Sequence, residues 1–196
     1  TKVYSQINVS KKIIKVENLY KQKIYGDDIT VAVIDTGIYP HYDFLFPKNR
    51  IICFKDFVGD KEYPYDDNGH GTFVAGCIGG GGVVNQKYKG VAPKCKLISL
   101  KALDKNGETG AFTILQAMQW IFDNKEKYNI KVVCMSFGAN PLQNNDPLLK
   151  GAERLWNSGV VVVAAAGNSG PEEETIKSPG ISTRIITVGA LDDKRN

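Results

Sequence analysis

Residues 30–37, Thr-Val-Ala-Val-Ile-Asp-Thr-Gly, constrain the possible folds of this chain more than any other stretch. Val31 to Ile34 form a short apolar run rich in β-branched residues, which is typical of a strand buried on both faces of a parallel sheet. The run ends in Asp35, after which the chain is expected to turn. A carboxylate at the carboxyl end of such a strand lies at the sheet edge where α/β folds bind their ligands. An Asp that only caps the following turn would give the same local pattern, so the rest of the chain must decide.

Strand-like and helix-like segments alternate along the chain after this stretch. The expected strands cover residues 51–53, 97–103, 132–137, 160–166 and 185–188, and the expected helices cover residues 70–78, 111–127 and 146–159. Apolar residues in the helix at 111–127 recur three and four positions apart, whereas the strands are mostly continuous apolar runs. The first 29 residues predict one short amphipathic helix ending near Gly26, and the four glycines at 79–82 predict a mobile loop.

This alternation predicts an α/β fold with three layers. Parallel strands need crossover connections, and right-handed crossovers place helices on both faces of a mostly parallel central sheet. No repeat or linker-like stretch divides the sequence. We therefore expect residues 1–196 to form a single domain, with residues 1–29 packing on it as an N-terminal segment.

Composition excludes several function classes. Hydrophobic residues make up 42% and charged residues 23%, as in ordinary globular domains, and no apolar run is long enough to span a membrane. The net charge of +4 is spread widely, so nucleic-acid binding is not expected. The four cysteines match no zinc-binding spacing. Together with the lack of a recognisable signal peptide they favour a cytoplasmic location, while leaving secretion open.

Three polar residues stand where an active site would lie in such a sheet. Asp35 ends the first buried strand, His70 opens a helix rich in small residues, and Asn168 follows the strand at 160–166. Each has an ordinary structural explanation, because a single His is often structural and Asn-Ser-Gly is a common turn. Their combination in one α/β chain nevertheless indicates a catalytic site.

Five sequence blocks around these residues resemble the subtilisin-like serine proteases, or subtilases. The blocks follow the family's order over nearly the whole chain after residue 29; they are Val-Ala-Val-Ile-Asp-Thr-Gly at 31–37, Asn-Gly-His-Gly-Thr at 68–72 with Val-Ala-Gly at 74–76, Lys-Gly-Val-Ala-Pro at 89–93, Met-Ser-Phe-Gly at 135–138 and Ala-Ala-Ala-Gly-Asn-Ser-Gly at 164–170. The resemblance implies a serine endopeptidase that hydrolyses protein or peptide substrates and uses no cofactor in catalysis.

The resemblance also implies roles for individual residues. His70 would be the general base of an Asp-His-Ser triad, and Asp35 would orient and stabilise its imidazole. Asn168 would donate a hydrogen bond to the oxyanion. The implied substrate-binding residues are Gly110 on an edge strand, and Ser136, Phe137, Gly138, Ala165, Ala166 and Gly167 in the walls of the pocket for the residue before the cleaved bond.

The serine of the triad is not found in a matching setting. None of the chain's serines stands in the family's Gly-Thr-Ser-Met-Ala type of sequence. We expect the nucleophile beyond Asn196, so that this chain is the N-terminal portion of a catalytic domain that is incomplete at its C-terminus and inactive alone. A C-terminal fragment of the same protein and a pro-segment would then be partners. The alternative is a non-catalytic, protease-like interaction module that lacks the nucleophile.

One further resemblance concerns a metal. Asp43 resembles a structural calcium ligand of secreted subtilases, and Asn85 is the only obvious side-chain ligand in the loop expected to complete that site. Calcium takes about six to eight oxygen ligands, so structural calcium is an open alternative that these two side chains do not complete. No catalytic metal is expected. Asp66 and Asp67 could bind a cation or a basic substrate residue, but a solvated acidic loop is the simpler interpretation.

Overall fold

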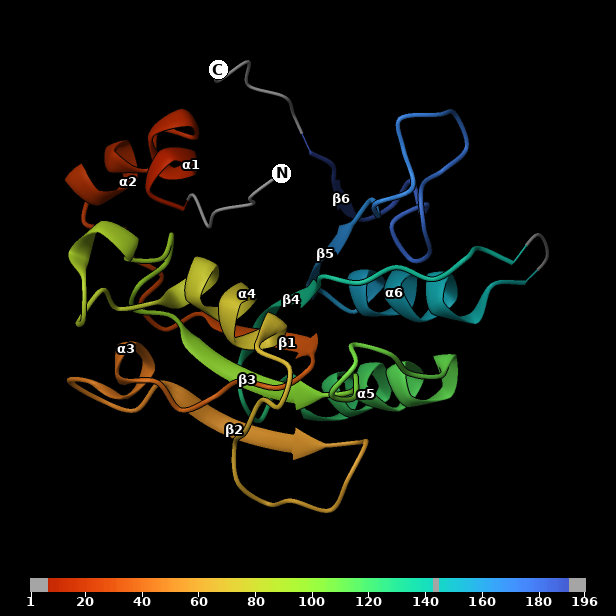
Figure 1. The fold of residues 1–196 in the computed structure, drawn as a ribbon, viewed down its shortest axis with the longest axis horizontal. Coiled ribbons are helices and arrows are strands. Elements are labelled where there is room, and N and C mark those ends of the chain that lie inside the picture. The colour runs from red at the N-terminus through yellow and green to blue at the C-terminus, as the bar shows by residue number, and fades with distance from the viewer. Residues whose placement is uncertain (1–6, 143–144, 191–196) are drawn as a thin grey trace.

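The computed structural model describes residues 7–142 and 145–190, and the structural statements below refer to these residues. They form a six-stranded sheet with parallel neighbours throughout, in the order β2-β3-β1-β4-β5-β6 (Figure 1). The strands are β1 (Thr30–Asp35), β2 (Ile51–Asp56), β3 (Lys96–Lys101), β4 (Ile130–Met135), β5 (Val161–Ala165) and β6 (Ile186–Val188). The predicted parallel α/β sheet is therefore confirmed.

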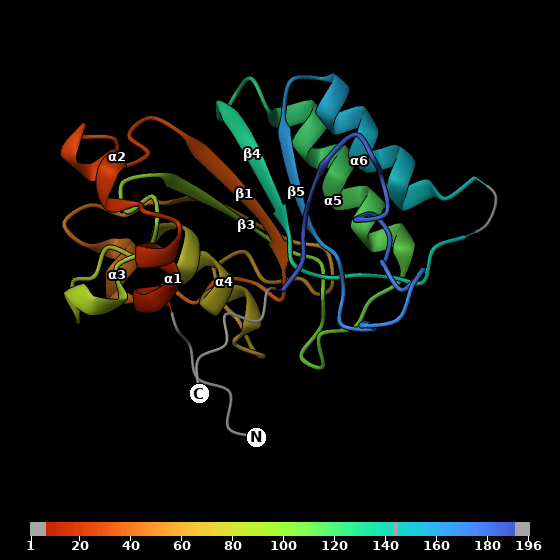
Figure 2. The ribbon, with the colours of Figure 1, turned by 90° about the horizontal axis from the view of Figure 1, so that it is seen from above.

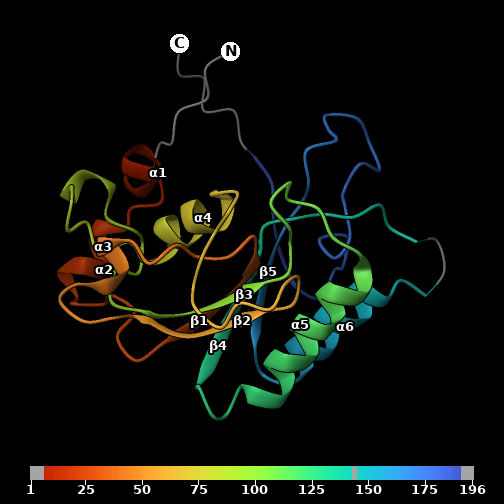
Figure 3. The ribbon, with the colours of Figure 1, turned by 60° about the horizontal axis from the view of Figure 1, so that its bottom comes forward.

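Helices cover both faces of this sheet. They are α1 (Ile7–Ile13), α2 (Glu17–Lys21), α3 (Tyr42–Leu45), α4 (His70–Gly79), α5 (Ala111–Asn124) and α6 (Pro147–Asn157), with a 3-10 turn, η1 (Gln86–Tyr88). Helix α6 begins after Asp146, whose carboxylate accepts hydrogen bonds from the N–H groups of Leu148 and Leu149. Figures 2 and 3 show α5 and α6 side by side on one face of the sheet and α4 on the other.

Two apolar cores, one on each face of the sheet, produce the three layers. Strand β1 contributes to both, because successive side chains of a strand point to opposite faces. Ala32 and Ile34 pack into the core that includes buried residues of α5 and α6. Val31 and Val33 pack into the core that includes Val74 of α4. A strand that is apolar on both faces is thus buried on both faces, as its composition predicts.

The N-terminal segment differs from the prediction of one helix ending near Gly26. Two short helices, α1 and α2, are present, because Lys15 adopts a left-handed φ of 55° that interrupts the helical path between them. Among the apolar residues of this segment, Val16 and Tyr20 are buried, whereas Leu19 is exposed.

The glycine-rich loop at 79–82 also differs from the prediction of a mobile loop, because hydrogen bonds anchor it. The N–H of Gly81 donates to the backbone carbonyl oxygen of Asp43 at 2.9 Å. The Asp43 carboxylate accepts from the N–H groups of Gly82 at 3.1 Å and Val84 at 3.0 Å. The glycines of this loop serve close packing, since most of the loop is buried.

No helix within residues 7–142 and 145–190 has both the length and the apolar character needed to cross a bilayer.

Candidate active site

The alternation of side chains along β1 decides where Asp35 points. Val31 and Val33 face the core beneath α4, and Asp35, two residues further on, continues the same series. Helix α4 begins at His70, directly after Gly69, whose left-handed φ of 101° turns the chain into the helix. The end of the central strand therefore faces the first residue of α4.

Asp35 and His70 contact each other directly. The Oδ1 atom of Asp35 lies 2.7 Å from Nδ1 of His70, which is the length of a charge-assisted hydrogen bond. An ionised carboxylate can only accept, so Nδ1 carries the proton and Nε2 is left free to accept another. The Asp35 side chain is 2% exposed and the His70 side chain 45% exposed, so an accessible base lies over a buried acid.

The ionisation of the buried Asp35 carboxylate depends on the groups around it. Burial raises the pKa of Asp35 above its ordinary value, and hydrogen bonds from His70 and from the backbone N–H of Thr36 oppose that rise. The Thr36 N–H donates to Oδ1 at 2.7 Å. Oδ2 is buried and has no hydrogen-bond partner within the described part of the chain. A carboxylate held in this way gains most from a positively charged imidazolium beside it, which is the state that a general base passes through.

Thr36 and Asp66 hold the start of α4 against the end of β1. The Thr36 hydroxyl accepts from the Gly71 N–H and donates to Asp66 Oδ1, both at 2.9 Å. Asp66 Oδ2 accepts from the N–H and the hydroxyl of Thr72 at 2.9 and 2.6 Å, and so caps the helix. Gly71 allows the close approach, because an added Cβ would lie 2.1 Å from the Gly37 carbonyl oxygen.

The expectation of a solvated acidic loop holds only in part, because Asp67 is exposed whereas Asp66 is half-buried. Asp66 caps α4, and Oδ1 of Asp67 accepts from the ammonium of Lys101 at 2.6 Å. Both carboxylates are therefore bound to groups of the chain itself. This arrangement does not favour a role for either one as a cation ligand or as a partner for a basic substrate residue.

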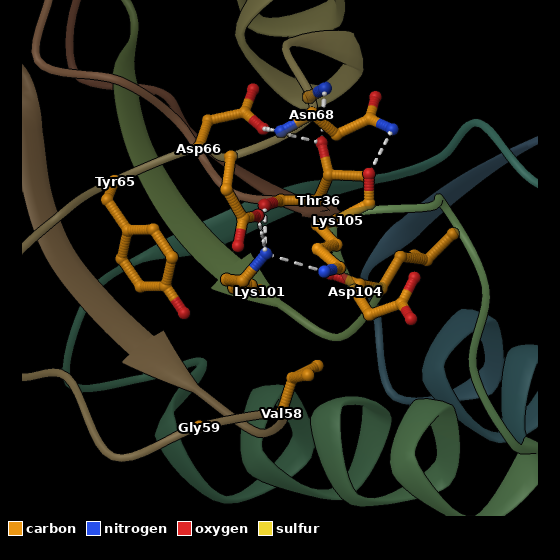
Figure 4. A network of polar contacts seen from close by, with 12 residues as sticks. Thr36, Val58, Gly59, Tyr65, Asp66, Asn68, Lys101, Asp104 and Lys105 are labelled. Atoms are coloured by element: carbon orange, nitrogen blue, oxygen red, sulfur yellow. Dashed lines mark hydrogen bonds and ion pairs between the residues drawn. The ribbon is translucent and has the colours of Figure 1, made fainter.

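No role was assigned from the sequence to two residues that contribute to the site. Lys101, the last residue of β3, is buried and donates to the carbonyl oxygen of Thr36 at 2.7 Å. Asn68 accepts from the His70 N–H at 3.1 Å and donates to the Lys105 carbonyl oxygen at 3.0 Å, which links α4 to the β3–α5 connection. Figure 4 shows these side chains around the turn that follows β1. The available signal for Lys101 was a lysine at the end of an otherwise apolar strand.

Sheet topology places Asn168 and Ser136 at the same edge as Asp35. Strands β1, β4 and β5 are adjacent and parallel, so the residues that follow them emerge at one end of the sheet. Ser136 and Phe137 follow β4 directly and are half-buried, and Asn168 follows β5 and is exposed. No hydrogen bond among the described residues joins Asn168 to the Asp35–His70 pair.

The two predicted pocket walls meet at one side chain that sequence reasoning missed. Ala165 ends β5, and Ala166 then pairs through its carbonyl oxygen with the Lys177 N–H at 2.8 Å. An added Cβ at Gly138 or at Gly167 would lie 2.5 Å from side-chain carbons of Lys177. The structure therefore brings Gly138 and Gly167 together across the stem of Lys177. Asn168 lines an adjacent pocket together with Ala166 and Gly167.

The segment before α5 differs from the expected edge strand. Residues 107–110 are not part of any strand, and the N–H of Asp104 instead donates to the carbonyl oxygen of Glu108 at 2.9 Å to close a turn. Gly110 precedes α5 with extended backbone angles, φ −84° and ψ 152°, and is exposed. The Asn68–Lys105 contact anchors the connection that leads to it.

The side chains around Asp43 do not fit a calcium ion. Both carboxylate oxygens of Asp43 face backbone N–H donors, and Oδ1 of Asn85 accepts from the Lys87 N–H at 3.0 Å. The guanidinium of Arg50 donates to the carbonyl oxygens of Asp43 and Gly79, so a side-chain cation already binds carbonyl groups there. Within the described ranges, no three His, Cys, Asp or Glu side chains are grouped to hold a metal ion.

Known proteins are similar in sequence to this chain over almost its whole length. The chain matches the Subtilase family over residues 26–196. It is 45% identical over 181 residues to Serine protease AprX of Bacillus subtilis (strain 168), in an alignment that covers 88% of this chain and 40% of that relative. Subtilisin DY of Bacillus licheniformis is 33% identical over 94% of this chain and 64% of its own length. The Thermostable alkaline protease of Halalkalibacterium halodurans is 32% identical over 91% of this chain and 46% of its own length.

Proposed function

Because this chain belongs to the subtilase family, we propose that the full-length protein is a serine endopeptidase with an Asp-His-Ser triad. The observation that carries the proposal is the 2.7 Å contact between Asp35 Oδ1 and His70 Nδ1, with the acid buried and the base exposed. The names of the relatives, which include a serine protease and a subtilisin, support the same activity on protein or peptide substrates.

The nucleophile of this proposal comes from polypeptide beyond Asn196. No serine hydroxyl in residues 7–142 and 145–190 is hydrogen-bonded to His70. The chain spans 40% of the length of one relative and 64% of another, so a substantial part of those proteins lies outside the match. In this proposal the chain is inactive alone, and its main partner is the C-terminal portion of the same protein. A pro-segment is a further proposed partner, on the resemblance alone.

The geometry of the pair determines what each residue does in the reaction. Serine Oγ attacks the peptide carbonyl carbon while Nε2 of His70 takes the hydroxyl proton. His70 then gives this proton to the leaving amine as the C–N bond breaks, and water releases the acyl group by the same route. Throughout, Asp35 keeps Nδ1 protonated and stabilises the imidazolium, which is why the acid must stay ionised and buried beside the ring.

Asn168 is the proposed donor to the oxyanion. Its support is its position after β5, at the sheet edge shared with Asp35, and its exposure beside the pocket walls. Removal of a donor of this type lowers kcat by about 10²- to 10³-fold. The walls at Gly138 and Gly167, with the stem of Lys177 between them, are the proposed site for the residue before the cleaved bond.

Peptidase kinetics on the full-length protein test the proposal. We expect His70→Ala and Asp35→Asn each to lower kcat by about 10⁴-fold or more, because a triad works as a unit. The matched control is His41→Ala, since His41 is the only other histidine in the chain and caps α3, away from the proposed triad. Its activity on a peptide anilide should stay within about twofold of wild type.

Labelling with a fluorophosphonate, which reacts with an activated serine, distinguishes a serine peptidase from a non-catalytic interaction module. A labelled serine C-terminal to residue 196, lost in His70→Ala, is the expected result. Activity that survives His70→Ala unchanged would contradict the triad. A full-length protein with neither label nor activity would instead support the non-catalytic interaction module.

A further inference from the structure

A buried lysine lies beside the catalytic acid without taking part in the proposed chemistry. Lys101 is the strand partner of Asp35 in the β1–β3 register and is 1% exposed. A buried ammonium must find partners for its three donors, or its desolvation is not compensated. Lys101 Nζ has three: the Thr36 carbonyl oxygen at 2.7 Å, Asp67 Oδ1 at 2.6 Å and the Leu103 carbonyl oxygen at 3.1 Å.

These three acceptors belong to three different segments of the chain. Thr36 is in the turn after β1, Asp67 is in the loop before α4, and Leu103 is in the connection that follows β3. The last segment is itself tied to the acid, because the N–H groups of Ala102 and Leu103 donate to the Asp35 carbonyl oxygen at 2.9 and 3.2 Å. One ammonium thus joins the segments on which the acid and the base depend.

Thr36 carries the effect of Lys101 to both members of the pair. Its N–H donates to Asp35 Oδ1, and its hydroxyl accepts from the N–H of Gly71, next to His70. Its carbonyl oxygen is the group that Lys101 holds. The N–H, hydroxyl and carbonyl of this one residue therefore all have hydrogen-bond partners. Figure 4 shows Thr36 beside Lys101.

We propose that Lys101 is a positioning residue for the Asp35–His70 pair, acting through Thr36; this inference rests on the proposed peptidase function. Without the ammonium, the Thr36 and Leu103 carbonyl groups lose their shared donor and Asp67 loses its partner. The turn after β1 is then free to shift relative to α4. A shift of about 1 Å at a reacting group can cost on the order of 10²-fold in rate.

The test is Lys101→Met in the full-length protein, which keeps the apolar stem and removes the charge. We expect kcat to fall by about 10- to 100-fold with KM within about twofold, measured well below the unfolding temperature. The matched control is Lys11→Met, because Lys11 is also buried and also donates to a backbone carbonyl oxygen, that of Lys89 at 2.6 Å. It should lose stability but keep kcat.

A spectroscopic readout separates failure of this inference from failure of the proposed function. The Nδ1 proton of His70 should give a downfield NMR resonance in the wild type, assigned by its loss in His70→Ala. We expect Lys101→Met to broaden or shift this resonance and Lys11→Met to leave it in place. If the wild type is inactive, the proposed function fails, but this resonance still decides the role of Lys101.

Two results would contradict a positioning role for Lys101. A kcat and a His70 resonance that are both unchanged in Lys101→Met would overturn it, and so would an equal loss of kcat in Lys11→Met. If Lys101→Met does not fold, Asp67→Ala replaces it, because Asp67 is partly exposed and is the anionic partner of Lys101. A severalfold lower kcat in Asp67→Ala supports the inference, and an unchanged kcat contradicts it.

Discussion

Gly71 is a residue at which α4 closely approaches the end of β1 and the turn that follows it. An added methyl group would meet the Gly37 carbonyl oxygen at 2.1 Å and Asp35 Oδ1 at 3.1 Å, and neither can move without disturbing the pair. We expect Gly71→Ala to lower the free energy of unfolding by about 1–3 kcal/mol through overpacking. The measurement is urea-induced unfolding followed by circular dichroism.

Gly76 provides the matched control in the same helix. An added Cβ there meets no atom within 4 Å, and the residue lies inside α4. Alanine should therefore raise the free energy of unfolding by about 0.4–1 kcal/mol, because it restricts the unfolded chain and favours the helix. Equal effects of the two substitutions would show that steric contact at Gly71 is not the cause.

At the scale of the element, Asp66 makes the start of α4 sensitive to acid. Burial acts to raise the pKa of Asp66, but hydrogen bonds from Thr72, Gly69 and Asn68 outweigh it and lower the pKa below its ordinary value. The stabilisation by Asp66 is therefore present above the unfolded pKa of about 4 and is lost as pH falls through the lower folded pKa.

Asp66→Ala tests this dependence. We expect it to lower the free energy of unfolding by about 0.5–2 kcal/mol at pH 7, with a smaller difference from wild type at pH 2. Asp60→Ala, in the same loop but exposed, is the control and should have little effect. A difference that stays constant from pH 7 to pH 2 would rule out the charge of Asp66 as the cause.

The loop between α4 and β3 gives a prediction about metal dependence. Arg50 binds the carbonyl oxygens of Asp43, Gly79 and Cys95, where a calcium ion was the open alternative. We expect Arg50→Met to lower the free energy of unfolding by about 1–3 kcal/mol, because buried acceptors lose a charged donor. Neither millimolar calcium nor a chelator should change the unfolding temperature through this loop. Stabilisation of the wild type by calcium, absent in Asp43→Ala, would show that a calcium site exists here.

At the scale of the whole molecule, α4 covers only part of its face of the sheet. Val161, Val163, Ile186 and Val188 continue that face across β5 and β6, and within the described residues they are exposed or only half-buried. Cys134 of β4, the strand partner of Val163, is also incompletely covered. Apolar surface of this kind is normally covered in a stable protein.

We expect further polypeptide to cover this surface in the full-length protein. Residues 1–196 expressed alone should bind the dye ANS strongly and self-associate in sedimentation experiments, because the β4–β6 face stays open to solvent. The full-length protein should bind several-fold less dye per molecule. Similar dye binding by both would contradict the proposal that additional chain packs on this face.

The parallel sheet and the positions of Asp35 and His70 at strand and helix ends were predictable because both rest on local patterns. A continuous apolar run indicates a strand buried on two faces, and its last residue, Asp35, marks the edge of the sheet. The small-residue helix that begins at His70 is equally visible in the sequence. The N-terminal helices were less predictable, since the break at Lys15 depends on a backbone angle that composition does not specify.

By itself the sequence determined the strands, the helices α4 to α6 and the residues that resemble an acid and its base. Only the tertiary structure decided how they are held. The Lys101–Thr36 hydrogen bond joins residues 65 positions apart, and the Asp43–Val84 bond joins residues 41 apart. Contacts at such separations leave no periodic pattern, because each depends on where the fold places both partners. For the same reason Asp66, Asp67 and Asp43 look like solvated or metal-binding carboxylates in sequence, but in the fold they bind the chain's own donors.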